Sequence, residues 1–276
     1  MPRIFDFGGL EVERCQTVAG LRGLRGSARR VTQTTAETAE EAAAADEAGV
    51  EMVVSRAANV RLVREGSSRL FVTAALGFTQ AVTADDMLRA AFDAVAAGAD
   101  AVITARGYEM VRMLAAESIP VVGHVGFVPR KSTWVGSVRA VGKTAAEALD
   151  LWDRCRRLED AGAFALECEL VPADVLSEIN GRTSLVTISL GSGGNADVIF
   201  LFASDICGES LKQPRHAQAW GNLARLHKAV REERVRALSG FRAAVASAEF
   251  PTSKQIAEIP SRELEDFRFQ LRAVQK

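Results

Sequence analysis

Short apolar segments alternate with alanine-rich helical segments along most of this 276-residue chain, and the alternation limits the folds that the chain can adopt. Most of the apolar segments are nearly continuous in hydrophobic residues, which is typical of parallel strands covered on both faces. Strands separated by helices form parallel sheets. The expected strands are residues 29–33, 51–55, 70–75, 101–105, 121–124, 163–168, 185–189 and 198–203.

Helix start and stop signals separate these strands. Thr83 precedes a helical pattern with two acids in its first turn, and Gly98 follows that pattern. Thr144 and Glu147 have the spacing of a capping box, and Gly162 stands where their helix should end. We therefore expect helices at residues 35–48, 83–97, 108–117, 144–161 and 172–180.

Eight strands with interleaved helices predict an α/β protein with a (β/α)8 TIM-type barrel, and a doubly wound sheet is the alternative. Residues 214–250 are expected to form a long amphipathic helix or a helix pair. No segment has the composition of a linker. We therefore expect one domain over residues 1–276, with the barrel at about 17–251 and a charged helical tail at 252–276.

Composition and charge exclude several classes of function. The 34 Lys and Arg residues nearly balance 35 Asp and Glu residues, so no basic excess is present to bind a nucleic acid. The longest apolar run spans only residues 198–203, which is far too short to cross a membrane. The first residues have no signal-peptide pattern, and the four cysteines are isolated from one another. A cytoplasmic protein that binds a small molecule is expected.

Two strand ends carry candidate catalytic side chains. His124 ends one expected strand, and Glu167 and Glu169 end another at positions that share a face. In a barrel, active sites lie at the carboxyl ends of the strands. Buried acids beside each other suit a general base. The alternatives are a hydrogen-bonded core histidine and glutamates in solvent.

Glycine-rich segments give weaker signals. Gly191-Ser-Gly-Gly194 follows an expected strand, and it is either an anion cradle or, as we favour, a turn. Gly142-Lys-Thr144 resembles the end of a phosphate-binding loop, but the preceding glycine is at the wrong spacing. We therefore do not expect nucleotide binding.

Several motifs resemble the ketopantoate hydroxymethyltransferase family, which belongs to the phosphoenolpyruvate mutase/isocitrate lyase superfamily of TIM-type barrels. The resemblance runs from about residue 17 to residue 251 and includes Ile188-Ser-Leu-Gly-Ser-Gly193. Its most specific parts are Val121-Val-Gly-His-Val-Gly-Phe-Val-Pro129, Gly142-Lys-Thr-x-x-Glu147, Leu158-Glu-Asp-Ala-Gly-Ala-Phe164 and Glu169-Leu-Val-Pro-Ala173.

The resemblance implies a reaction. Members of the family transfer a hydroxymethyl group from methylenetetrahydrofolate to 2-oxoisovalerate, and Mg²⁺ holds the oxo acid. A glutamate that matches Glu169 removes the proton alpha to the ketone, and the family histidine matches His124. The family's Thr-x-Thr-Ala segment falls on residues 33–36 and keeps Thr35. Members form homo-oligomers, so the resemblance implies a homo-oligomer here.

The metal site of the family does not carry over to this chain. The resemblance places the two metal aspartates at Ala57 and Ala75, and the family's lysine and glutamate at Ile103 and Ala105. The family's His-Asp pair on the last strand falls on Ser204-Asp205. Because Mg²⁺ needs carboxylate oxygens, we expect no bound metal and no cofactor.

The expected function is therefore a divergent enzyme that acts on a 2-oxo-acid-like substrate by metal-independent proton abstraction, with Glu169 and His124 as catalytic residues. The reaction would form or cleave a C–C bond or isomerise the substrate, as a step of secondary metabolism. The alternatives are a non-catalytic binding or regulatory protein and a genuine 3-methyl-2-oxobutanoate hydroxymethyltransferase. Arg56 and Arg106 are expected to supply positive charge, although both lie one residue from the inward-facing positions. The expected substrate-binding residues are Thr35, Ser55, Arg56, Arg106, Glu167 and Ser189.

Overall fold

The computed structural model describes residues 3–210 and 212–274, and these divide into two compact units. Unit 1 is Met1–Gly221 and unit 2 is Asn222–Lys276. This division differs from the single domain expected from the sequence. The last barrel strand ends at Phe200, so the barrel belongs wholly to unit 1 and does not extend to residue 251.

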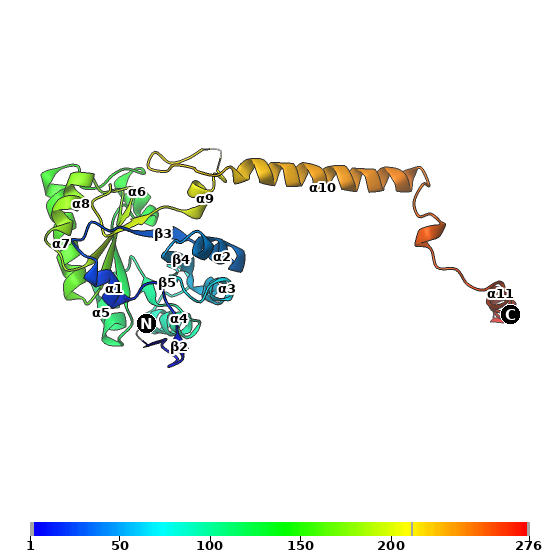
Figure 1. The fold of residues 1–276 in the computed structure, drawn as a ribbon, viewed down its shortest axis with the longest axis horizontal. Helices are drawn as coiled ribbons and strands as arrows, with labels where there is room; N and C mark the ends of the chain where they lie inside the picture. Colours follow the sequence, from blue (N-terminus) through cyan, green and yellow to red (C-terminus); the bar gives the residue numbers. More distant parts are fainter. Residues whose placement is uncertain (1–2, 211, 275–276) are drawn as a thin grey trace. The chain divides into compact units, whose positions relative to one another are not determined.

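Eight parallel strands form a closed barrel in the order β10-β3-β4-β5-β6-β7-β8-β9. Helices surround these strands (Figure 1). The barrel confirms the expected (β/α)8 fold, and the doubly wound alternative is wrong. All eight expected strands are present, with ends that differ by a few residues. The strands are β3 (Val31–Thr35), β4 (Met52–Arg56), β5 (Phe71–Ala75), β6 (Ala101–Ile103), β7 (Val121–Gly126), β8 (Ala165–Glu169), β9 (Val186–Leu190) and β10 (Val198–Phe200).

Helices cover the outside of the barrel, and several of them begin at the expected caps. Thr83 and Asp86 form the capping box of α4, and the hydroxyl of Thr144 accepts a hydrogen bond from the backbone N–H of Glu147 at the start of α7. The helices of unit 1 are α1 (Val18–Gly23), α2 (Ala39–Glu47), α3 (Val60–Gly66), α4 (Ala84–Ala96), α5 (Tyr108–Ala116), α6 (Ser132–Val135), α7 (Ala145–Asp160), α8 (Ala173–Asn180) and α9 (Ala203–Ile206). A hairpin of β1 (Ile4–Phe5) and β2 (Glu11–Val12) precedes them, and short 3-10 turns lie at η1 (Ala57–Asn59) and η2 (Pro129–Lys131).

Alternate residues of each strand form two separate apolar layers. Met52, Phe71, Val122 and Ile188 belong to the cluster that fills the barrel interior, and Leu21 of α1 packs against them. The other residues of the strands pack against the surrounding helices. This alternation decides which side chains at the strand ends point into the mouth of the barrel.

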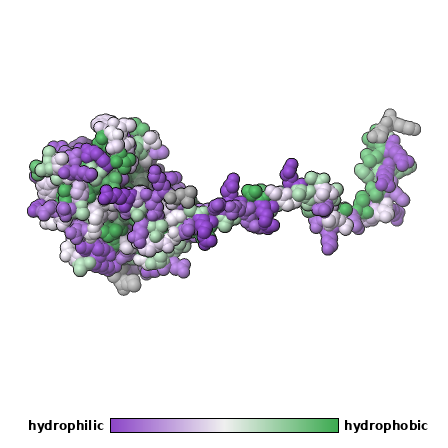
Figure 2. Space-filling model, turned by 90° about the horizontal axis from the view of Figure 1, so that it is seen from above, coloured by the Kyte–Doolittle hydropathy of each residue, from purple (hydrophilic) through white to green (hydrophobic). Residues whose placement is uncertain are grey.

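Unit 2 consists of α10 (Leu223–Ala246), the turn η3 (Ser253–Gln255) and α11 (Ser261–Val274). The expected long helix is therefore present at residues 223–246, and the last two residues of the expected tail lie outside the described residues. None of the residues of α10 or α11 is buried within the chain. Figure 2 shows that α11 is hydrophobic on one side and hydrophilic on the other. In the described parts of the chain, no helix combines the length and apolarity needed to span a membrane.

Gly126 brings the ends of β7 and β8 together. It has a φ of +88°, and a Cβ atom there would lie 2.1 Å from the carbonyl oxygen of Glu169. That oxygen accepts a hydrogen bond from the N–H of Phe127 at 2.8 Å. Only glycine permits both the backbone conformation and the close approach, so Gly126 fixes the strand end that carries Glu169.

Replacing Gly126 by alanine should lower the free energy of unfolding by at least about 2 kcal/mol, because the methyl group must displace backbone and because φ is positive. Chemical denaturation would measure the change. Gly23→Ala is the matched control, since nothing lies within 4 Å of a Cβ atom at that position. A Gly126→Ala protein as stable as the Gly23→Ala protein would contradict this role.

Candidate active site

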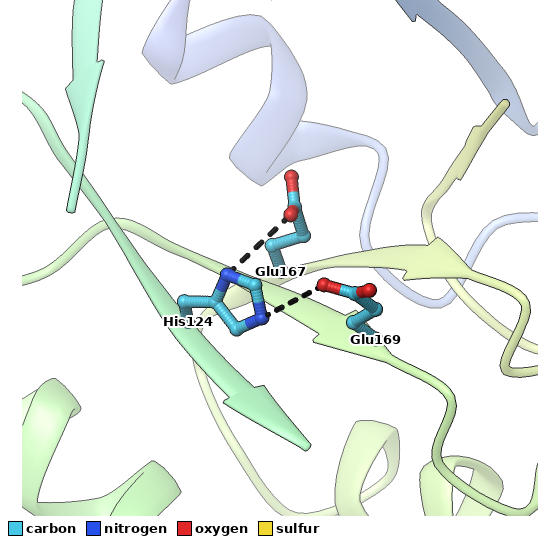
Figure 3. A group of neighbouring side chains, drawn as sticks. All are labelled: His124, Glu167 and Glu169. Atoms are coloured by element: carbon cyan, nitrogen blue, oxygen red, sulfur yellow. Dashed lines mark ion pairs between the residues drawn. The ribbon is translucent and has the colours of Figure 1, made fainter. Parts of the chain in front are cut away.

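His124, Glu167 and Glu169 meet at the carboxyl end of the barrel. His124 is on β7, both glutamates are on β8, and the strand register pairs His124 with Glu167 and Gly126 with Glu169. The alternation places all three side chains on the interior side, since Val122 and Ala165 of the same strands belong to the interior cluster. The structure therefore brings together the three candidates that the sequence placed at strand ends (Figure 3).

The imidazole of His124 lies between the two carboxylates. Its Nδ1 atom is 3.6 Å from Glu167 Oε1, and its Nε2 atom is 3.4 Å from Glu169 Oε2 (Figure 3). Nε2 also lies 2.9 Å from the carbonyl oxygen of Phe127. Each ring nitrogen thus faces an acceptor, an arrangement that suits the doubly protonated imidazolium. The three side chains are only 10%, 7% and 15% exposed for His124, Glu167 and Glu169.

Burial and charge act in opposite directions on His124. Burial alone would lower its pKa, but the hydrogen bond to Glu169 and the charges of both glutamates outweigh burial and raise the pKa above 6.5. Burial also raises the pKa of Glu167, and the charge of Glu169 adds to this effect while His124 opposes it. The pKa values of His124 and Glu167 are thus both shifted upward by their shared environment, and Glu169 is the carboxylate nearest the strand end.

The glycine-rich loop holds the end of β8 in place. The hydroxyl of Ser192 donates to the carbonyl oxygen of Cys168 at 2.7 Å and accepts from the N–H of Val171 at 2.8 Å. The hydroxyl of Ser189 donates to the carbonyl oxygen of Gly193 and accepts from the N–H of Ser192. The loop is thus a hydrogen-bonded turn that supports Glu169, as we favoured, and the Ser189 hydroxyl is used within it.

Arg56 occupies the inward-facing position at the end of β4. It follows Met52 and Val54, which pack in the barrel interior, at the same two-residue spacing. The expectation that Arg56 lies one residue off the inward positions was therefore wrong, because the strand continues through Arg56 and Ala57 already begins η1. The guanidinium group is 78% exposed, with Nε 3.5 Å from Glu37 Oε1.

Glu37 is a residue of the barrel mouth that the sequence analysis missed. Its carboxylate accepts hydrogen bonds from the hydroxyl of Ser55 at 3.2 Å, from the N–H of Arg56 at 3.2 Å and from the amide of Asn59 at 2.7 Å. Ser55 itself is buried and points away from the barrel interior. The signal in the sequence was an acid two residues beyond a strand end, at the face where barrel sites lie.

Two other predicted residues have backbone partners. The hydroxyl of Thr35 accepts from the N–H of Ala203 at 3.1 Å, which joins the end of β3 to α9. Arg106 does not join the His124 cluster. Its Nη2 atom donates to the carbonyl oxygens of Phe78 at 2.8 Å and Ala81 at 2.5 Å, in the loop that follows β5.

The residues at the mouth do not fit Mg²⁺. The inward positions at the ends of β4, β5 and β6 are Arg56, Ala75 and Ile103, which offer no carboxylate oxygen. His124, Glu167 and Glu169 have ligand atoms within 4.8 Å of one another. However, the Nε2 atom of His124 donates to the carbonyl oxygen of Phe127, and a nitrogen that carries a proton is not free to bind a metal. Mg²⁺ prefers oxygen ligands in an octahedral arrangement, which this cluster does not provide.

Comparison with known proteins establishes the family. A sequence model described as ketopantoate hydroxymethyltransferase matches residues 55–253. The chain belongs to the ketopantoate hydroxymethyltransferase family. One relative, the 3-methyl-2-oxobutanoate hydroxymethyltransferase of Pyrococcus furiosus, is 32% identical over 209 residues, which are 74% of this chain and 71% of the relative. The enzyme of the same name from Pyrobaculum calidifontis is 34% identical over 199 residues, 71% of this chain and 72% of the relative.

Solved structures confirm the fold of this family member. Phosphonopyruvate hydrolase, in complex with oxalate and Mg²⁺, matches with a TM-score of 0.52 and 16% identity, covering 94% of this chain and 98% of that one. A 2,3-dimethylmalate lyase of the phosphoenolpyruvate mutase/isocitrate lyase superfamily matches with a TM-score of 0.50 and 12% identity, covering 94% of this chain and 99% of that one. The barrel is therefore of the type found in that superfamily.

The imidazole of His124 should keep its second proton to a higher pH than an ordinary histidine, because acceptors face both of its nitrogens. Nuclear magnetic resonance of protein with ¹⁵N-labelled histidine would show a titration midpoint above 6.5. Glu169→Gln should lower that midpoint, whereas Glu178→Gln on α8 should leave it unchanged. A neutral ring at pH 6.5 in the wild-type protein would contradict this assignment.

The raised pKa of His124 makes the free energy of unfolding depend on pH. Its pKa is raised in the folded protein, so the folded state binds this proton more tightly than the unfolded chain. The resulting stabilisation is complete below the unfolded-state pKa of about 6.5 and is lost as pH rises through the folded-state pKa.

Proposed function

We propose that this family member is an enzyme that removes a proton from the carbon alpha to the ketone of a 2-oxo acid without a metal ion. The observation that carries the proposal is the placement of Glu169 beside the buried His124, whose pKa is raised, with Arg56 at the inward end of β4. A carboxylate base and two cationic groups at one barrel mouth suit the formation of an enolate.

Glu169 is the proposed base. The C–H bond of the substrate breaks, its proton passes to a carboxylate oxygen of Glu169, and its electron pair forms the enolate. Before this step the ring of His124, whose Nε2 atom lies 3.4 Å from Glu169 Oε2, orients the carboxylate of Glu169. Reaction of the enolate with an electrophile then forms a C–C bond, and return of the proton at the same carbon gives exchange or isomerisation.

Arg56 is the proposed binding group for the 2-oxo acid. A guanidinium group binds a carboxylate through two parallel hydrogen bonds. Arg56 now pairs with Glu37 at 3.5 Å, but both side chains are solvent-accessible, at 78% and 32% exposure. An exposed pair of this kind contributes at most about 1 kcal/mol, so a bound carboxylate can compete with Glu37 at little cost.

The names of the relatives favour a second function, that of a genuine 3-methyl-2-oxobutanoate hydroxymethyltransferase. If this chain had that function, it would form ketopantoate from 2-oxoisovalerate and methylenetetrahydrofolate. Arg56, Ala75 and Ile103 at the inward strand ends argue against the Mg²⁺-dependent form of that reaction. Product analysis with and without Mg²⁺ separates the two functions.

In deuterated water the protein should exchange the C3 proton of 2-oxoisovalerate, and the exchange should persist in the presence of a chelator. Glu169→Gln should reduce the exchange rate by about 10²–10⁴-fold while binding weakens little, because the change removes the base and keeps its shape. Proton nuclear magnetic resonance of the substrate measures the rate. His124→Ala should also slow exchange, and Glu167→Gln should have a smaller effect.

Glu178→Gln is the control, because Glu178 lies on the outer helix α8 and pairs with Arg182. If the Glu169→Gln protein still exchanged the C3 proton at the wild-type rate, Glu169 would not be the base. Exchange that disappears with the chelator and returns with Mg²⁺ would support the second function. Absence of both exchange and ketopantoate formation would support a non-catalytic binding or regulatory protein.

The expected homo-oligomer stays a prediction, and unit 2 supplies its surface. Leu226, Val230, Leu238 and Phe241 of α10 are exposed within a single chain, as are Phe267 and Leu271 of α11. Apolar faces of this kind are covered in stable assemblies. We expect a solution mass of at least two chains by light scattering, and a mass near 30 kDa at micromolar concentration would contradict it.

A further inference from the structure

A cavity of about 420 Å³ lies beside His124, outside the His124–Glu167–Glu169 cluster. Its wall includes residues from the carboxyl end of β7, the segment after β6, and the helices α5 and α7. A volume in this range is that of a site for a small organic molecule. Because His124 belongs to the wall, a molecule in the cavity would lie next to the group that the proposed function places beside the base.

The cavity wall is strongly cationic. It contains five cationic side chains and two acidic ones, which leaves a net charge of +3 before His124 is counted. The two acids are already paired on α7, Asp150 with Arg154 and Asp153 with Arg157, each at 2.9 Å. The remaining cations, Arg106, Arg130 and Lys131, form no ion pair within the described part of the chain.

These three cations are held close together by the rest of the fold. Arg130 stacks on Phe78, with its guanidinium carbon 3.2 Å from the ring centroid, and its Nη2 atom donates to the carbonyl oxygen of Ala105 at 3.2 Å. Arg106 lies 5.8 Å from the same ring. The pKa of Lys131 is lowered by burial and by the charges of Arg154 and Arg130, although Asp150 opposes this effect. The cations therefore repel one another.

Arg106 has an unused donor. Its Nη2 atom is bonded to two carbonyl oxygens, but its Nε atom is buried and has no hydrogen-bond partner among the described residues. A buried donor of a charged group without a partner is costly. The N-terminus of α5, whose cap residue Gly107 provides no side-chain hydrogen bond, also faces this cavity and adds positive potential.

We infer that this cavity binds a second anionic group of the substrate, so that the substrate is a 2-oxo acid with an additional carboxylate or phosphate. The assignment of the 2-oxo acid rests on the proposed function, whereas the anion site rests on Arg106, Arg130 and Lys131 alone. An anion relieves the repulsion among these cations and supplies acceptors for their donors. The relatives' substrate 2-oxoisovalerate, as implied by the resemblance, has no group for this subsite.

Calorimetric binding of 2-oxoglutarate and 2-oxoisovalerate tests the inference, because only 2-oxoglutarate has a second carboxylate. We expect 2-oxoglutarate to bind at least about tenfold more tightly, the effect of one good charge-assisted contact. The double variant Arg130→Gln/Lys131→Gln should reduce the ratio of the two affinities to about twofold or less. Competition by inorganic phosphate and by succinate then shows whether phosphate or carboxylate is the preferred group.

The double variant Arg112→Gln/Lys143→Gln is the matched control, because it removes the same charge from positions outside the cavity. It should keep the affinity ratio of the wild-type protein, and thermal unfolding should show that both variants are folded. Equal binding of the two oxo acids by the wild-type protein, or an equal loss in the control, would overturn the inference. These affinities are measured without turnover. The binding experiment can therefore contradict the anion site while Glu169-dependent proton exchange persists, and proton exchange can be absent while the anion site is confirmed.

Discussion

The contact between His124 and two carboxylates is the interaction on which the barrel mouth depends. Two glutamates on one strand face the same side of the sheet, and burying both as anions would be costly. The register of β7 and β8 places His124 beside them, so that its imidazole ring lies between the two carboxyl groups. Gly126 and the Ser192 turn then hold the strand ends in the positions that this arrangement requires.

Positive charge at the end of β4 comes from the protein itself, through Arg56. At residues 57, 75 and 105, where the family resemblance places carboxylates, this chain has alanine. Arg56 is fixed to a strand end, and its acid partner Glu37 is in turn held by Ser55 and Asn59. Under the proposed function, Arg56 supplies positive charge that Mg²⁺ supplies in the reaction implied by the family resemblance.

Sequence patterns predicted the barrel because strand hydrophobicity, helix caps and the family motifs all agreed. The positions of His124 and Glu169 followed from the rule that barrel sites lie at carboxyl strand ends. The direction of Arg56 was wrong because it depended on whether β4 ended at residue 55 or 56, and periodicity does not define strand ends to one residue. Glu37 and the Arg106–Arg130 stack on Phe78 were missed because they join loops that are distant in sequence, and no local pattern reports such contacts.

The adjacency of β7 and β8 has an evolutionary consequence. His124, Glu167 and Glu169 belong to the neighbouring strands β7 and β8, whereas the positions that differ from the metal site implied by the family resemblance lie at or just after the ends of β4, β5 and β6. None of those positions contributes an atom to the contacts of His124 with Glu169 and Phe127. Under the proposed function, a barrel divided in this way can change the molecule that it recognises through mutations in one arc of strands and keep its acid–base residues in the other.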